Sequence, residues 1–413
     1  MVKFNRFILD NGLRVIVHED HTTPMAVLNI LYDVGARDED PERTGFAHLF
    51  EHLMFGGSVN IPQYDEPLQR VGGENNAFTT NDITNYYITL PAENIETAFW
   101  LESDRMLSLA FSEKSLEVQR NVVIEEFKQR YLNQPYGDVW LKLRPLVYKK
   151  HPYQWATIGK NLEQIENARI EDVKAFFKKH YNPSNAILVV GGNITVEKAK
   201  ALAEKWFGPI PGGEKYHRDL PKEPQQSEAR RETVTANVPL NDLYIAFHMP
   251  GRLENGYYEL DLVSDILSRG NSSRLYRRLV KEKQLFSEIH AYNMGSFDSG
   301  MFVIEGKPLE NVSIEEAEAA VWEELEQLKQ YRVPDEELTK VKNKTESTMV
   351  FSEMSLLDKA MNLAQFELFG DAGILNHETE KYLAVTAEGI QKEAQDIFRK
   401  ENSSTLVYLA ESH

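Results

Sequence analysis

Two histidines and a glutamate stand close together in the segment TGFAHLFEHLMFGG, residues 44–57. His48 and His52 are four residues apart and Glu51 follows His48 by three, so a helix would bring all three to one face. The rest of the segment is mainly apolar, and no other ionisable residue is mixed in. Because His and Glu side chains are ligands of divalent metal ions, the segment predicts a metal centre.

The order H-x-x-E-H also suggests a reaction. Two imidazoles at this spacing can bind one Zn²⁺, with Zn–N bonds of about 2.0–2.1 Å. The order is the reverse of H-E-x-x-H, and its glutamate acts as general base on the water that the metal activates. Glu51 is therefore the expected base, with Thr44 as the helix N-cap and Gly56-Gly57 as the stop. The alternative is an amphipathic helix whose His/Glu face is simply solvated.

A hydrolytic zinc site needs a third protein ligand and one open position. The segment SEKSLEVQRNVVIEEFKQR, residues 112–130, offers two glutamates. On a helix Glu126 shares a face with Gln119 and Val122, whereas Glu125 lies about 100° away. The apolar run NVVI before the pair favours a packed helix over a solvated one.

Composition limits which classes of function are open. The 413 residues are 42% hydrophobic and 27% charged, which is typical of a globular protein. They include no cysteine, so a metal must be bound by His, Asp or Glu. The net charge of −18 argues against nucleic acid or an anionic membrane as partner. No membrane span and no signal peptide are evident, so the chain is expected to be cytoplasmic unless a leader has been removed.

An internal repeat organises the chain. RIEDVKAFFKKHYNPSNAILVVGGN and TAEGIQKEAQDIFRKENSSTLVYLAES share the order helix, turn and strand, with Asn182 and Asn402 in matching turns. Three regions follow, an N-terminal zinc-binding domain (1–212), a linker (213–231) and a homologous C-terminal domain (232–413). Each domain is predicted to be α+β, with a mixed, mostly antiparallel sheet flanked by helices. The predicted strands are 13–19, 25–35, 85–91, 186–192, 233–238, 243–249, 300–307 and 405–410.

These motifs together resemble the pitrilysin-type, or inverzincin, zinc metallopeptidases, relatives of the mitochondrial processing peptidase and of insulin-degrading enzyme. The resemblance rests on the H-x-x-E-H motif and QRNVVIEEF, and it extends through NGLRVIVHED, GARDED, YNPSNAILVVGG and SSRLYRRLVKEKQL. It implies the family's metallohydrolase fold and one Zn²⁺ per chain, with His48, His52 and Glu126 as ligands and Glu51 as catalytic base. Gln119 departs from the family pattern, where many members carry an assisting glutamate.

The resemblance also implies a substrate-binding strand. The stretch GGENNAFTTNDITNYYITLP contains Asn76, Ala77 and Phe78, which match an edge strand beside the zinc in that family. An extended peptide adds to such an edge through main-chain hydrogen bonds, which favours unfolded substrates. From the residues alone an ordinary hairpin is an equal alternative.

The C-terminal domain is predicted to have no metal site, because its matching helix, LDLVSDILSRG, has no histidine. In the family an Arg and a Tyr from a C-terminal half bind the substrate carbonyl. When this chain is aligned with the family's segment through Glu282, Gln284 and Leu285, Val280 and Ser287 stand at those two positions. Arg277, Arg278 and Tyr292 are nearby and are possible substitutes.

The sequence therefore predicts a zinc metallopeptidase subunit that cleaves extended or unfolded peptides. A homologous partner chain would supply the Arg/Tyr pair in a heterodimer, with a homodimer as the other possibility. The alternative function is a non-catalytic or weakly active structural subunit of such a heterodimer.

Overall fold

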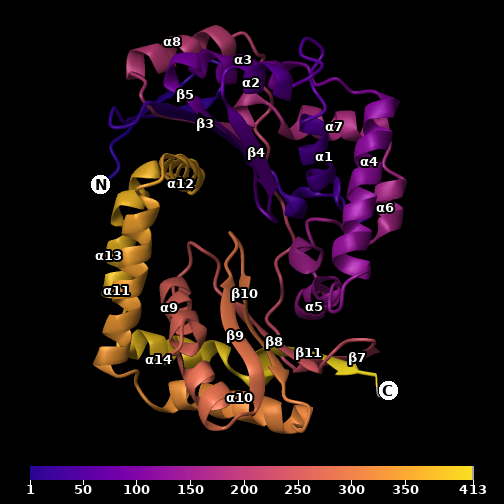
Figure 1. The fold of residues 1–413 in the computed structure, drawn as a ribbon, viewed down its shortest axis with the longest axis vertical. Coiled ribbons are helices and arrows are strands. Elements are labelled where there is room, and N and C mark those ends of the chain that lie inside the picture. Colours follow the sequence, from indigo (N-terminus) through magenta and orange to yellow (C-terminus); the bar gives the residue numbers. More distant parts are fainter. Residues whose placement is uncertain (412–413) are drawn as a thin grey trace. The chain divides into compact units, whose positions relative to one another are not determined.

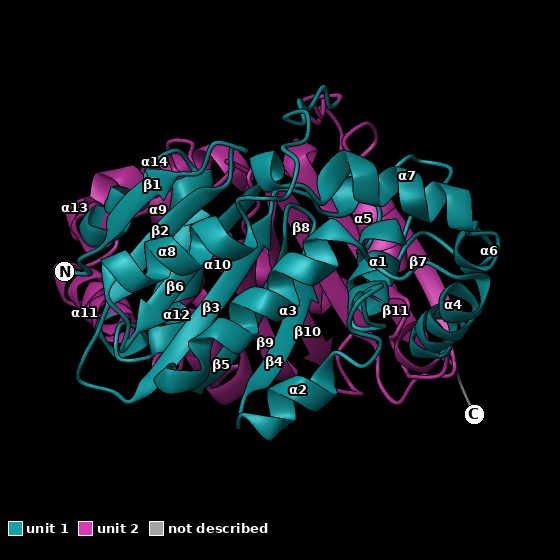
Figure 2. Ribbon diagram, turned by 90° about the horizontal axis from the view of Figure 1, so that it is seen from above, with its two compact units in different colours: residues 1–128, 155–220, 350–377 teal, residues 129–154, 221–349, 378–413 magenta. Residues whose placement is uncertain are grey.

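The computed structural model describes residues 1–411, and the chain forms two compact units of mixed α and β structure (Figure 1, Figure 2). Unit 1 comprises residues 1–128, 155–220 and 350–377. Unit 2 comprises residues 129–154, 221–349 and the chain from 378 onwards. Each half of the sequence thus contributes a short segment to the unit that is built mainly from the other half.

A six-stranded sheet is the framework of unit 1. The strand order is β1-β2-β6-β3-β5-β4, and all neighbouring pairs are antiparallel except β2 and β6, which are parallel. The strands are β1 (Asn5–Ile8), β2 (Arg14–Glu19), β3 (Met25–Tyr32), β4 (Glu74–Thr79), β5 (Thr84–Pro91) and β6 (Ala186–Gly192). The helices are α1 (Phe46–Met54), α2 (Asp65–Arg70), α3 (Ile95–Leu107), α4 (Glu113–Phe127), α6 (Leu162–Glu166), α7 (Ile170–His180), α8 (Val196–Trp206) and α12 (Leu356–Leu368).

Helices cover both faces of this sheet. The central strands β3 and β6 are buried along almost their whole length, as expected of strands without a solvated face. α3 and α8 lie on one side, and α12 packs on the other against β3 and β6 (Figure 1). Gly191 and Gly192 of β6 allow this close approach, because a Cβ on either would lie within 3.2 Å of a Leu356 methyl group.

Unit 2 repeats this design with five strands in the order β7-β11-β8-β10-β9. β7 and β11 are parallel and the other pairs antiparallel, which reproduces β2-β6-β3-β5-β4 of unit 1 as the internal repeat predicts. The strands are β7 (Arg230–Ala236), β8 (Asp242–Met249), β9 (Phe286–Met294), β10 (Gly300–Pro308) and β11 (Ser403–Ala410). The helices are α5 (Val139–Val147), α9 (Tyr257–Ser268), α10 (Ile314–Gln330), α13 (Glu378–Ala384) and α14 (Ala387–Ile397), and α11 (Asp335–Ser352) runs past residue 349, where unit 2 gives way to unit 1.

Alternating side chains show that this second sheet is also covered on both faces. Ile245 and Phe247 of β8 join the core formed with α9, α10 and α14. Tyr244 and Ala246 join a separate core with Leu143 of α5. Because successive side chains of a strand point to opposite faces, α5 lies on the face opposite to the other three helices.

The predicted fold class is confirmed, and all eight predicted strands are present. The residue patterns did not predict β1 and β9, which lie at sheet edges. No position of β1 is buried, and β9 mixes buried with exposed positions. The boundaries 1–212, 213–231 and 232–413 stay a prediction about domains. Among residues 1–411, no helix is both long enough and apolar enough to cross a bilayer.

Candidate metal centre

The predicted histidine-bearing helix is α1, and apolar packing decides which face it presents. Phe50 packs on Tyr181, with 4.2 Å between ring centroids. His48, Glu51 and His52 lie on the other side and are partly exposed. The buried positions are Phe46, Ala47, Leu49, Phe50, Leu53 and Met54.

The start of α1 differs from the prediction. Thr44 is not the N-cap, and its hydroxyl bonds elsewhere: it donates to Gln164 Oε1 at 2.5 Å and accepts from the Lys160 N–H at 2.8 Å. The N-cap is Gly45, which has φ +87°, a backbone conformation that side chains disfavour. The end is as predicted, since α1 stops at Met54 just before Gly56-Gly57.

Three side chains of unit 1 converge in a geometry that suits one metal ion. His48 Nε2 and His52 Nε2 lie 3.6 and 3.5 Å from Glu126 Oε2, and within residues 1–411 this is the one group of three such ligands. Tetrahedral bonds of about 2.05 Å place ligand atoms about 3.3 Å apart, close to the two observed distances. The donor set of two imidazoles and one carboxylate is that of a catalytic zinc site with an open fourth position.

Helix α4 carries Glu126 and packs beside α1. It begins at a capping box formed by Ser112 and Ser115 and buries Leu116, Val123, Ile124 and Phe127. Glu126 sits beside this apolar stripe and is 18% exposed, whereas Glu125 is 72% exposed and bonds Lys128 at 2.8 Å. The structure therefore brings Glu126, not Glu125, to the two histidines.

Glu51 lies one residue before His52 and contacts the edge strand. Thr79 Oγ1 donates to Glu51 Oε2 at 2.5 Å. Burial raises the pKa of Glu51, and the Thr79 hydrogen bond and His52 oppose this shift. A raised pKa brings a carboxylate nearer the range in which a general base works at neutral pH. The Thr79 contact had no signal in the sequence, because it joins positions 28 residues apart.

The predicted substrate strand is β4, and it is an edge of the sheet. Asn76, Ala77 and Phe78 pair on one side with β5, and among the described residues no strand pairs with the other side. The Ala77 N–H donates to its neighbour's side chain, Asn76 Oδ1, at 2.8 Å. A local side chain, and not another strand, thus occupies this main-chain donor.

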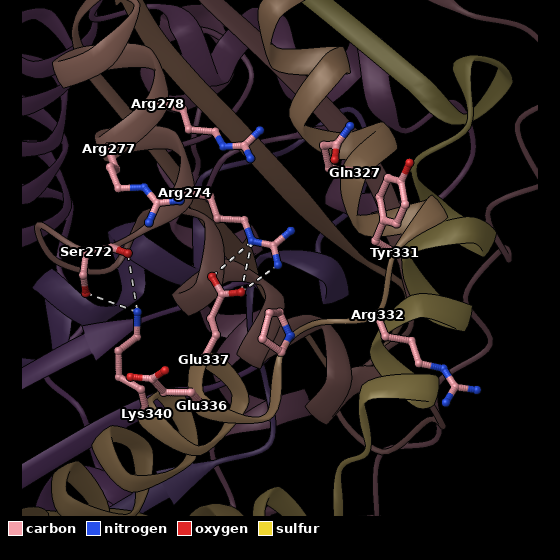
Figure 3. A pocket seen from close by; sticks show the side chains of 11 residues that line it. Ser272, Arg274, Arg277, Arg278, Gln327, Tyr331, Arg332, Glu336, Glu337 and Lys340 are labelled. Atoms are coloured by element: carbon pink, nitrogen blue, oxygen red, sulfur yellow. Dashed lines mark hydrogen bonds and ion pairs between the residues drawn. The ribbon is translucent and has the colours of Figure 1, made fainter.

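A pocket of about 570 Å³ in unit 2 is lined by five cationic side chains and by two carboxylates, Glu336 and Glu337 (Figure 3). Arg274 donates to both oxygens of Glu337, and Arg278 bonds the fully buried Glu324 at 3.0 Å. Lys340 donates to Ser272 Oγ at 3.2 Å. These bonds tie the loop and helix of SSRLYRR to α10 and α11.

Comparison with known proteins gives two family matches. The model described as insulinase (peptidase family M16) matches residues 14–148, and the model described as peptidase M16 inactive domain matches residues 167–345. The first range contains His48, His52 and Glu126, and the second contains none of them.

Individual relatives agree with these matches. A Helicobacter pylori protein named zinc protease PqqE is 30% identical over 98% of this chain and 93% of its own length. The crystal structure of a protease from Helicobacter pylori has a TM-score of 0.92 and 29% identity, and it covers 99% of this chain and 100% of that chain. The beta subunit of the Saccharomyces cerevisiae mitochondrial-processing peptidase is 28% identical over 59% of this chain and 53% of its own length.

Proposed function

This chain belongs to peptidase family M16, and from that membership we propose that it is a zinc-dependent metallopeptidase acting on extended or unfolded peptides. The observation that carries the proposal is the convergence of His48, His52 and Glu126, with Glu51 on the same helix.

Each site residue has a separate role in this proposal. His48, His52 and Glu126 would hold the ion, which would supply a Lewis acid for the scissile carbonyl and for a water molecule. Glu51 would accept a proton from the attacking water and pass it to the leaving amine. Its partly buried position, which raises its pKa, supports this role, and Thr79 keeps one carboxylate oxygen oriented.

Peptide binding is assigned to the edge of β4 that no described strand pairs with, where a substrate would displace Asn76 Oδ1 from the Ala77 N–H. An extended substrate would add as a further strand through main-chain groups of Asn76, Ala77 and Phe78. α1 contacts β4, and Thr79 at the end of β4 bonds Glu51. A peptide paired with β4 would therefore run past the metal ligands, and folded helical segments would not fit this edge.

The chain also needs a partner for the remaining catalytic groups. Val280 packs with the apolar core of unit 2, and Ser287 donates to the Lys307 carbonyl at 3.1 Å, so neither offers a cation or a phenol. Each of the possible substitutes has an acidic partner. Arg277 pairs with Glu282 at 3.6 Å, Arg278 bonds Glu324 and Tyr292 donates to Glu305 at 2.6 Å. We therefore expect a homologous partner chain to supply an Arg/Tyr pair in a heterodimer.

A structural subunit is the second candidate function. The match of residues 167–345 to the peptidase M16 inactive domain and the missing Arg/Tyr pair favour it. It differs from the first candidate in what the site must do, since a structural subunit requires neither a bound metal nor an intact Glu51.

Metal analysis combined with peptide cleavage tests the proposal. Purified chain should contain about one zinc per molecule, and unstructured peptides should be cleaved, most strongly when a homologous chain is added. Glu51→Gln should retain the zinc and abolish cleavage, because an amide cannot accept the proton. A zinc-free protein, or equal cleavage by Glu51→Gln, would refute the assignment.

A further inference from the structure

The N-terminus of the zinc-motif helix α1 has no cap of its own. The first N–H groups of a helix have no partner inside it, and a Ser, Thr, Asp or Asn at the N-cap usually binds one of them. Here the N-cap is Gly45, which has no side chain. A larger residue is excluded, because a Cβ at Gly45 would lie 2.7 Å from the Ile158 carbonyl oxygen.

Glu39, six residues before that N-cap, provides the hydrogen-bond acceptors for the start of α1. Its Oε2 accepts from the Gly45 N–H at 3.0 Å, and its Oε1 accepts from the Ala47 N–H at 2.8 Å. The side chain is 6% exposed, so water does not compete for these bonds. A negative charge at this end of a helix also interacts favourably with the helix dipole.

The segment that carries Glu39 is itself fixed to the end of the edge strand. The Ala36 and Arg37 N–H groups donate to the carbonyls of Thr80 and Asn81 at 3.1 and 2.9 Å. Residues 80 and 81 directly follow β4, and Arg37 forms a buried ion pair with Asp82 at 3.0 Å. The turn at residues 36–39 therefore connects the end of β4 to the start of α1.

The same two elements meet again at the catalytic base. Thr79, the last residue of β4, bonds Glu51 in the second turn of α1. The position of α1 relative to β4 is thus held by Glu39 at its start and by the Thr79–Glu51 bond near its middle. His48 is the residue after Ala47, so a shift of the Glu39 contact would move the first predicted metal ligand directly.

We propose that Glu39 is a positioning residue of the metal centre, whose carboxylate holds the start of α1 so that His48 and His52 face Glu126. This inference rests on the proposed zinc site. Burial raises the pKa of Glu39 to about 8, and the two backbone N–H groups oppose this shift because they favour the ionised form. The variants are therefore compared at pH 9 and above, where most of the Glu39 carboxyl group is ionised.

The test compares Glu39→Gln with Glu42→Gln in the full chain. Glu42 is an exposed carboxylate three residues further on, so it controls for the loss of one charge in the same segment. Gln at position 39 can accept one of the two hydrogen bonds but turns an NH₂ group toward the other donor. Zinc affinity would be measured by competition with a chelator, and the visible spectrum of the Co²⁺-substituted protein would report the ligand geometry.

Glu39→Gln should bind zinc about tenfold more weakly, the scale found when a supporting contact of a metal ligand is removed, and its Co²⁺ bands should shift. Glu42→Gln should match the wild type in both measurements. Glu39→Asp keeps the charge but is too short to reach both donors, so it should show the same weaker zinc binding and shifted Co²⁺ bands. It replaces Glu39→Gln in the test if that variant does not fold.

Unchanged zinc affinity and Co²⁺ bands in a folded Glu39 variant would overturn the positioning role while leaving the zinc site intact. Failure of the wild type to bind zinc would remove both proposals together.

Discussion

Replacing Glu126 by Gln should weaken zinc binding by two to three orders of magnitude, while the same change at the adjacent Glu125 should have almost no effect. Both residues are glutamates on α4, but their carboxylates point in different directions. Glu126 Oε2 lies 3.5 and 3.6 Å from the two histidine nitrogens. Glu125 is 72% exposed, and within residues 1–411 its carboxylate bonds only Lys128.

The expected magnitude follows from the number of ligands. Zinc sites with four protein ligands bind with about 10–16 kcal/mol, so one ligand accounts for about 2.5–4 kcal/mol. Since about 1.4 kcal/mol is a factor of ten, Glu126→Gln should raise the zinc dissociation constant by about 100- to 1,000-fold. An exposed ion pair such as Glu125–Lys128 contributes at most about 1 kcal/mol to stability, and its loss should change zinc affinity less than about threefold.

The assay is a titration of each purified variant in chelator-buffered zinc, with circular dichroism as a check of folding. Equal weakening in both variants, or a larger effect at Glu125, would refute the placement of Glu126 as the third ligand. Full affinity in Glu126→Gln would show that a different group completes the site.

Three further predictions address the base, a buried histidine and the partner. Thr79→Val should lower kcat about tenfold with zinc content unchanged, because Glu51 loses a hydrogen bond of about 1.4 kcal/mol or more, and Thr79→Ser should restore most of the activity. Burial and the charges of Lys179 and Arg218 lower the pKa of His180 to about 3, so stability should fall as pH drops below its unfolded value near 6.5. Between pH 7 and 5 the free energy of unfolding should decrease by about 2 kcal/mol more in the wild type than in His180→Phe, and equal pH slopes in denaturant titrations would contradict this. The purified chain alone should bind zinc but cleave an unstructured peptide at least about tenfold more slowly than with a homologous partner, and full activity of the chain alone would exclude a partner requirement.

The helix face that the candidate ligands share could be predicted from local spacing. His48, Glu51 and His52 share one helix face because a helix turns once in 3.6 residues, and the apolar positions between them fix the face that is buried. The central strands were predictable for the same kind of reason, since continuous apolar runs such as AILVVGG indicate strands buried on both faces. The role of the three residues in metal binding stays a prediction.

Local spacing could not predict which distant segments pack against one another. Periodicity alone left Glu125 and Glu126 as competing ligands, and the packing of α4 beside α1 brought Glu126 to the histidines. Helices α5 and α12 each belong to the unit formed mainly by the other half of the chain, because the open faces of the two sheets bury them.

The hydrogen bonds that position the site residues could not be predicted from spacing either, because they depend on how the chain folds. Thr44 has the right residue type and place for an N-cap, yet Gln164 engages its hydroxyl and Glu39 binds the helix start instead. Residue types and spacing along one helix therefore determined which side chains could bind a metal. Hydrogen bonds between residues 6 to 120 positions apart decided how those side chains are held, and only the folded chain specifies them.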